Sequence, residues 1–171
     1  DPGFERLGIA ILEKSKDNKR EKVVFSECFK TSAKLEFTER LKLIGEEVRK
    51  IIKEYKPEVL AIETLFLNTN QKTVMRVAEA RGVVVYEAAQ AGLEIFEASP
   101  PQIKIAITGY GRADKKQVQK MVELLVNNPV RSSRATVLRT RAFGTSATSN
   151  GTDDELDAIA IALTAFAHIK N

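Results

Sequence analysis

The sequence of 171 residues has no tryptophan, one histidine (His168) and one cysteine (Cys28). A single cysteine excludes an internal disulfide, and these two residues are too few for a zinc site of the usual Cys and His ligands. No apolar run approaches the roughly 18 residues of a membrane-spanning helix, and we expect no secretory leader. These absences favour a cytoplasmic protein without a membrane segment, in which Cys28 is buried in a strand.

Charge is balanced over most of the chain. The formal net charge is +4, and the segment 129–152 contains four arginines (131, 134, 139 and 141) and no acidic residue. These four arginines equal the whole net charge, so the remainder is neutral overall. A nucleic-acid surface would therefore have to come from local clustering of basic residues.

The length and composition predict a single domain over residues 1–171. Within it, residues 127–152 are rich in Ser, Thr, Arg and Gly and show little periodicity. A loop this long in a compact domain is usually functional or disordered. We expect a mobile insertion, with DNA contact by its arginines as the alternative.

The remaining chain alternates between strand and helix patterns. A β-hairpin is predicted by the first two apolar runs, and proline, capping and periodicity patterns mark the later elements. The predicted strands cover residues 7–13, 22–30, 59–62 and 93–98, and the predicted helices cover 36–55, 71–90, a short stretch from 100, a stretch begun by Asp114 and a final one from 153. This order predicts an α/β fold with an antiparallel hairpin joined to parallel strands.

The stretch 57–70 carries the first candidate site. Its apolar run at 59–62 predicts a strand covered on both faces, and Glu63 follows directly. A carboxylate at that end of a strand lies where open α/β sheets bind ligands. Phe66 then stands in a polar loop. The ordinary alternative is a salt-bridged strand end for Glu63 and a core contact for Phe66.

Two further acids, Asp154 and Asp157, lie three residues apart in the first turn of the last predicted helix. They share one helix face and repel each other unless a cation or a proton intervenes, and Mg²⁺ prefers carboxylate oxygens. The alternative is favourable interaction of both acids with the helix dipole. A leading Asp1 and the strand-end Glu63 favour the metal site.

The predicted helix 71–90 carries several small residues, among them Ala80, Gly82, Ala88 and Ala89. Small side chains allow a second helix to approach closely, so this helix is a candidate partner surface. Packing of the same residues onto the sheet is the alternative.

A set of short motifs, taken in order, resembles the RuvC family of Holliday junction resolvases, whose fold is ribonuclease-H-like. They are Asp1-Pro2-Gly3, Ala61-Ile62-Glu63 with Phe66, Ala80-Arg81-Gly82, Gln102-Ile103-Lys104, the stretch 113–118 and the final stretch DELDAIAIA at 154–162. Each motif is weak alone, but their order and spacing are specific. The resemblance implies a mixed five-stranded sheet flanked by helices, with the strand that the family has before Asp1 missing from this sequence.

The resemblance also implies an activity and its residues. The expected function is a structure-selective endonuclease that resolves Holliday junctions by paired strand cleavage in DNA recombination and repair. Two Mg²⁺ ions per subunit, replaceable by Mn²⁺, would be held by Asp1, Glu63, Asp154 and Asp157. DNA would be contacted by Phe66, Asn70, Lys104, Lys115 and Lys116. The helix 71–90 would form a homodimer, and RuvA and RuvB would be partners.

Two alternatives stay open at this point. Arg6 and Gly8 also fit the pattern of YqgF-type enzymes, which are similar nucleases linked to ribosomal RNA processing. The abrupt start at Asp1 also fits a junction-binding protein without catalytic activity.

Overall fold

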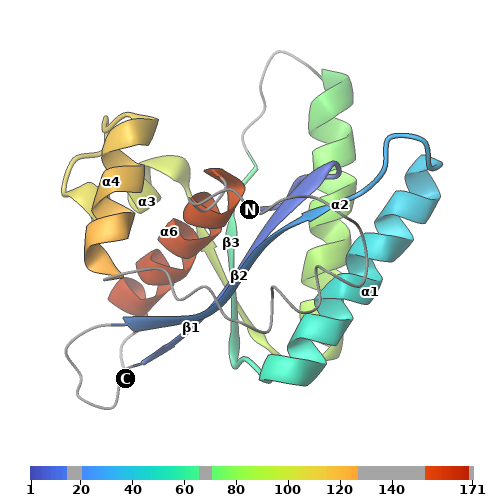
Figure 1. The fold of residues 1–171 in the computed structure, drawn as a ribbon, viewed down its shortest axis with the longest axis horizontal. Coiled ribbons are helices and arrows are strands. Elements are labelled where there is room, and N and C mark those ends of the chain that lie inside the picture. The colour runs from blue at the N-terminus through green and yellow to red at the C-terminus, as the bar shows by residue number, and fades with distance from the viewer. Residues whose placement is uncertain (15–20, 66–70, 127–152, 170–171) are drawn as a thin grey trace, which may run out of the picture.

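The computed structural model describes residues 1–14, 21–65, 71–126 and 153–169. Four strands and five helices are assigned within these ranges, beginning with two strands and ending with three helices (Figure 1). They are β1 (Arg6–Lys14), β2 (Glu21–Lys30), α1 (Phe37–Tyr55), β3 (Val59–Glu63), α2 (Gln71–Gln90), β4 (Glu94–Ala98), α3 (Pro100–Thr108), α4 (Lys115–Leu125) and α6 (Asp153–His168). The predicted α/β order is confirmed, and the helix 71–90 has the predicted bounds. The segment 127–152 lies outside the described residues.

The strands form two pairs. β1 pairs antiparallel with β2, with an irregularity between Ile11 and Leu12, and β3 pairs parallel with β4. In the described ranges these are two separate two-stranded sheets. Of the five strands that the resemblance implies, four are present in the described ranges, arranged as these two pairs.

A groove of about 570 Å³ separates the two strand pairs. Its walls include most of β1, all but the last residue of β3, and apolar side chains of α1 and α6 such as Ile52 and Phe166. This groove explains one wrong expectation. The apolar run Val59, Leu60 and Ala61 is only half-buried, although its sequence predicts a strand covered on both faces. Of the four apolar residues of β3, all of which line the groove, only Ile62 is buried.

Helices cover the strands from two sides (Figure 1). One core, which includes Ile159, Val122 and Val23, joins α3, α4 and α6 to the strands. The other, which includes Ile44, Ile62 and Leu7, joins α1 and α2 to the opposite face. The first strand pair and β3 are held between these layers, so their ends form the edge on which a site can be built.

Local sequence explains where the helices begin. The Asp114 carboxylate accepts a hydrogen bond from Gln117 N, and Asp114 N donates one to Gln117 Oε1. This capping box starts α4 as predicted. Ser99 and Gln102 form the same arrangement before α3, and Gly109 ends that helix with a φ of 75°. In the described part of the chain, none of the helices has the length and apolar character needed to span a bilayer.

Candidate active site

Asp1 is held at the edge of the molecule by Gly8. The α-nitrogen of Asp1 donates to Gly8 O at 3.1 Å, and Gly8 N donates to Asp1 O at 3.0 Å. These reciprocal bonds are those of an antiparallel pair. The chain therefore reverses its direction over the span between Asp1 and Gly8. In Figure 1 the N-terminus lies next to the start of α6 and the end of β3.

Glu63 ends β3, as predicted. Arg81 of α2 donates through Nε to Glu63 O at 3.1 Å and forms an ion pair with Glu97 of β4 at 2.7 Å. Burial raises the pKa of the Glu63 carboxyl, the nearby α-ammonium of Asp1 opposes the increase, and the charge of Asp157 adds to it. Arg81 thus holds the backbone of Glu63, and the Glu63 carboxyl group lies within electrostatic reach of Asp157.

Asp154 and its neighbour Glu155 bind side chains of the first sheet. Asp154 Oδ2 lies 3.4 Å from Cys28 Sγ, which donates to it, and 3.5 Å from Arg6 Nη1. Ser26 Oγ donates to Glu155 Oε2 at 3.0 Å. Ser26 and Cys28 are two positions apart, so their side chains lie on the same face of β2. This strand therefore contacts both acids at the start of α6.

Asp157 is paired with a lysine. Lys115 Nζ lies 3.1 Å from Asp157 Oδ2 and 3.4 Å from Asp153 Oδ2. Burial opposes the charge of Lys115, but the hydrogen bond to Asp157 and the charges of both acids outweigh it, so the pKa of the ammonium is raised. A cation therefore already lies between carboxylates at this position.

Three of the predicted acids lie within electrostatic reach of the backbone of the fourth, Asp1. Glu63, Asp157 and Asp154 all act electrostatically on the α-amino group of Asp1, whose pKa is lowered by burial to about 6. Within the described ranges, however, no three His, Cys, Asp or Glu side chains form a ready-made metal cluster. The donor chemistry, four carboxylates from three parts of the chain, fits a hard divalent cation. A cation bound by Asp157 would have to displace the Lys115 ammonium from it.

The predicted DNA contacts are only partly described. Phe66 and Asn70 lie outside the described residues. Lys115 and Lys116 are exposed at the start of α4, whereas Lys104 is half-buried on α3. Of these three lysines, only Lys115 has a described ion pair with the acids.

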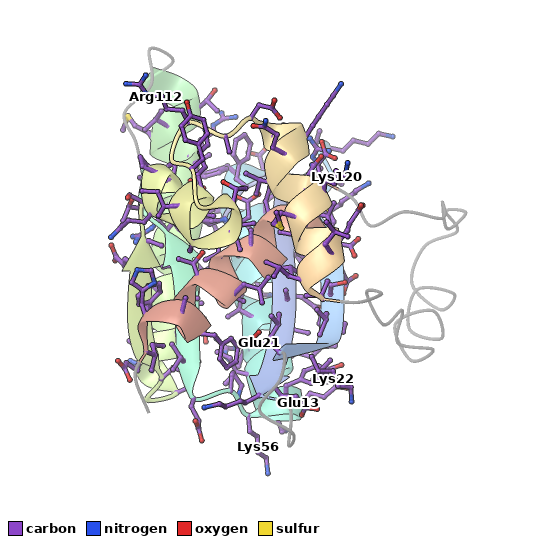
Figure 2. The ribbon with its side chains drawn as sticks, turned by 90° about the vertical axis from the view of Figure 1, so that its left-hand side faces the viewer. Glu13, Glu21, Lys22, Lys56, Arg112 and Lys120 are labelled. Atoms are coloured by element: carbon purple, nitrogen blue, oxygen red, sulfur yellow. The ribbon has the colours of Figure 1, made fainter. Side chains whose placement is uncertain are left out.

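The side chains labelled in Figure 2 lie toward two opposite ends of the molecule. Glu13, Glu21, Lys22 and Lys56 lie at one end, where Lys22 and Glu13 form an ion pair of 3.4 Å. Arg112 and Lys120 lie toward the other end.

Sequence reasoning named Arg6, Gly8, Cys28 and Arg81 but assigned none of them a contact with the acids of this site. These contacts join residues as much as 148 positions apart, such as Arg6 with Asp154.

Known proteins match this chain closely. A family model described as crossover junction endodeoxyribonuclease RuvC matches residues 1–138. The chain is 46% identical over 127 residues to the RuvC of Thermosipho melanesiensis, covering 74% of this chain and 80% of that protein. It is 48% identical over 127 residues to the RuvC of Alkaliphilus metalliredigens, covering 74% of this chain and 76% of that protein.

Solved structures agree in fold. The Thermus thermophilus RuvC structure matches with a TM-score of 0.75 and 27% identity, covering 96% of this chain and 89% of that one. The T. thermophilus RuvC in complex with a Holliday junction substrate matches with a TM-score of 0.75, 24% identity, and coverage of 96% and 88%. The ribonuclease-H-like α/β fold implied by the motifs is confirmed.

Proposed function

The chain belongs to the RuvC family of crossover junction endodeoxyribonucleases, and we propose that Asp1, Glu63, Asp154 and Asp157 form the site with which it cuts four-way DNA junctions. The family identifies the chain as a structure-selective endonuclease of DNA recombination and repair. It also favours a DNA junction over the ribosomal RNA that YqgF-type enzymes process.

The observation that carries this proposal is the convergence of four acids from distant segments. Asp1 pairs with β1, Glu63 ends β3, and Asp154 and Asp157 begin α6. Glu63, Asp154 and Asp157 lie within electrostatic reach of the α-amino group of Asp1, and Asp157 also acts on Glu63. Like charges this close repel each other, so a divalent cation in place of the Lys115 ammonium would stabilise the arrangement.

We assign the cation site to these four carboxylates, with two Mg²⁺ ions per subunit and Mn²⁺ as a substitute. Bound ions of this kind supply an activated water and neutralise charge on the phosphate and on the leaving 3′ oxygen. The carboxyl of Glu63 must lose its proton before it can bind a cation. Lys115 must move away from Asp157, and its ammonium is then free to contact a phosphate.

DNA contacts belong to the same proposal. Lys115 and Lys116 are exposed at the start of α4, where they can bind backbone phosphates and give salt-dependent affinity. Lys104 on α3 and Asn70 would add contacts. Phe66, as predicted from the resemblance, would act as an apolar wedge next to unstacked bases at the junction.

A homodimer through α2 suits a junction with two equivalent strands to cut. The solvent-exposed positions of α2 include Met75, Glu79, Gly82, Tyr86 and Ala89, spaced by four and three residues. Met75 is 65% exposed and Tyr86 is 59% exposed. By contrast, Ala80 and Ala88 are buried, so those two small residues pack inside the subunit, as the alternative expected.

Association with RuvA and RuvB and a cytoplasmic location follow only from the resemblance and from cysteine usage, respectively. Both stay predictions.

The decisive test is cleavage of a synthetic four-way DNA junction by a Glu63→Gln variant. The substitution removes one ligand charge at nearly constant size, so cleavage in Mg²⁺ should fall at least about 100-fold, a loss that even outer-sphere substitutions reach. Junction affinity in EDTA should stay unchanged, because phosphate contacts dominate it. Glu58→Gln, an exposed acid just before the other end of β3, is the matched control and should cleave normally.

Three results would contradict the proposal. Normal cleavage by Glu63→Gln would remove this residue from the site. Faster cleavage of structured RNA than of the junction would favour a YqgF-type activity. Tight, metal-independent junction binding without cleavage by the native protein would favour a binding protein.

A further inference from the structure

We propose that Gly8 and Cys28 are positioning residues that together seat Asp154 in the acidic site. Gly8 sets how closely the start of α6 approaches Asp1, and Cys28 sets which oxygen of Asp154 is turned to the metal. This inference rests on the proposed function, because it concerns the geometry of the same site.

Gly8 is a contact point for two of the four acidic residues. A Cβ placed on Gly8 would lie 2.1 Å from Asp154 O, 2.8 Å from Asp154 C and 3.3 Å from Asp1 Cβ. Real side chains essentially never approach backbone atoms so closely, and backbone atoms cannot yield as a flexible side chain does. Any residue larger than glycine at this position must therefore push the start of α6 away from β1.

The same glycine also carries the pairing that holds Asp1. Its backbone N–H and C=O form both hydrogen bonds to Asp1, and its missing side chain leaves room for Asp154. The distance between these two acids is thus fixed by a single residue of β1. Sites of this kind lose activity steeply when a reacting group moves by about 1 Å.

Cys28 orients the Asp154 carboxylate from the side of β2. Its side chain is 5% exposed, and its thiol donates to Asp154 Oδ2 at 3.4 Å. The guanidinium of Arg6 contacts the same oxygen at 3.5 Å. Both of these contacts fall on Oδ2, so in this proposal Oδ1 is the oxygen of Asp154 that would bind a cation.

Gly8 and Cys28 should affect the position of Asp154 in different ways. Gly8 acts on the position of the α6 backbone, so its loss moves the acidic residues of the first turn of α6 together. Cys28 acts on one carboxylate only, so its loss weakens the cation site without moving the helix. Outer contacts of this kind to a metal ligand are typically worth 10- to 100-fold in metal affinity or activity.

The test compares the native protein with Gly8→Ala, Cys28→Ala, Cys28→Ser and Asp154→Asn. Gly111→Ala is the matched control, because a Cβ there would first meet atoms of the exposed, flexible Ile105 side chain. Three quantities are measured: the melting temperature in EDTA, the affinity for Mn²⁺ in a direct binding titration, and the rate of junction cleavage at saturating Mg²⁺.

We expect Gly8→Ala to bind Mn²⁺ weakly and to cleave about 100-fold more slowly than the native protein. Cys28→Ala should bind Mn²⁺ about tenfold more weakly. Cys28→Ser, which keeps a donor to Asp154, should bind Mn²⁺ like the native protein. Gly111→Ala should match the native protein in all three measurements. If Gly8→Ala does not fold, the comparison of Cys28→Ala with Cys28→Ser decides.

The outcomes separate this inference from the proposed function. If Asp154→Asn loses Mn²⁺ binding and cleavage while folded Gly8→Ala and Cys28→Ala keep both, only the seat is overturned. Equal Mn²⁺ affinity of the Cys28→Ala and Cys28→Ser proteins would also overturn the role of Cys28. If Asp154→Asn itself binds Mn²⁺ and cleaves normally, the assignment of the site fails, and the seat fails with it.

Discussion

The charged form of Glu63, which is the form proposed to bind a cation, destabilises the folded state. Its carboxyl is partly buried and lies near Asp157, and both conditions disfavour the charged form. A raised pKa in the folded protein means that the unfolded chain ionises first, at about its ordinary value of 4.5. As the pH increases from that value through the raised pKa, ionised Glu63 therefore destabilises the folded state.

Glu63→Gln should accordingly be more thermostable than the native protein in EDTA at pH 7. The gain should shrink as the pH falls toward 4.5 and vanish below it, where Glu63 is protonated in both states. Melting temperatures from pH 4 to 8, measured by circular dichroism, test this expectation. A gain that is constant over the whole range, or a loss at pH 7, would contradict it.

Arg81 supports Glu63 from α2. Its guanidinium is largely buried and joins Glu63 O to the side chain of Glu97. Arg81→Ala should lower the free energy of unfolding by about 1–3 kcal/mol, the usual cost of losing hydrogen bonds to a charged group. Urea denaturation measures the change.

Glu97→Gln is the control for Arg81, because it removes only the half-exposed partner. It should cost no more than about 1 kcal/mol, as surface ion pairs do. Equal losses for both variants would mean that the bond to the Glu63 backbone contributes little.

Residues differ in how far the sequence reveals them. Glu63 and Asp157 could be predicted, because each follows a local pattern at a strand end or a helix start. Gly8 and Cys28 could not be assigned a role, because their importance arises only when β1, β2 and α6 are brought together. A glycine in a strand and a cysteine in an apolar run have ordinary explanations until their distant partner is known.

Elements were predicted more securely than the site. Proline, capping and apolar periodicity act within a few residues, and they placed the starts of α3, α4 and α6 correctly. The coverage of β3 was wrong for a physical reason. An apolar run predicts burial on both faces, whereas burial of Val59, Leu60 and Ala61 depends on what occupies the groove next to them.

The start of α4 gives a prediction at this scale. Asp114 caps the helix that carries Lys115 and Lys116. Asp114→Ala should reduce the free energy of unfolding by about 1 kcal/mol, because the backbone N–H of Gln117 loses its partner. Urea denaturation again provides the measurement, and Asp114→Asn, which keeps an acceptor, should retain most of the stability. Equal stability of the alanine variant and the native protein would contradict the capping role.

At the scale of the whole molecule, we expect a dimer that forms through α2. Tyr86→Arg places a charge in the exposed stripe of that helix and should convert a dimer into a monomer, measured by light scattering. Leu124→Arg is the matched control, because Leu124 is equally exposed, at 59%, but lies on α4. A native protein that is monomeric, or a Tyr86→Arg variant that stays dimeric, would contradict the proposed interface.

The central claim for the molecule is that Glu63, Asp154 and Asp157 share divalent cations with Asp1. Anomalous diffraction from crystals grown with Mn²⁺ tests it most directly. The account predicts anomalous density within ligand distance of carboxylate oxygens from both Glu63 and the start of α6, with Lys115 moved away from Asp157. Manganese bound elsewhere, with Lys115 still paired to Asp157, would contradict it.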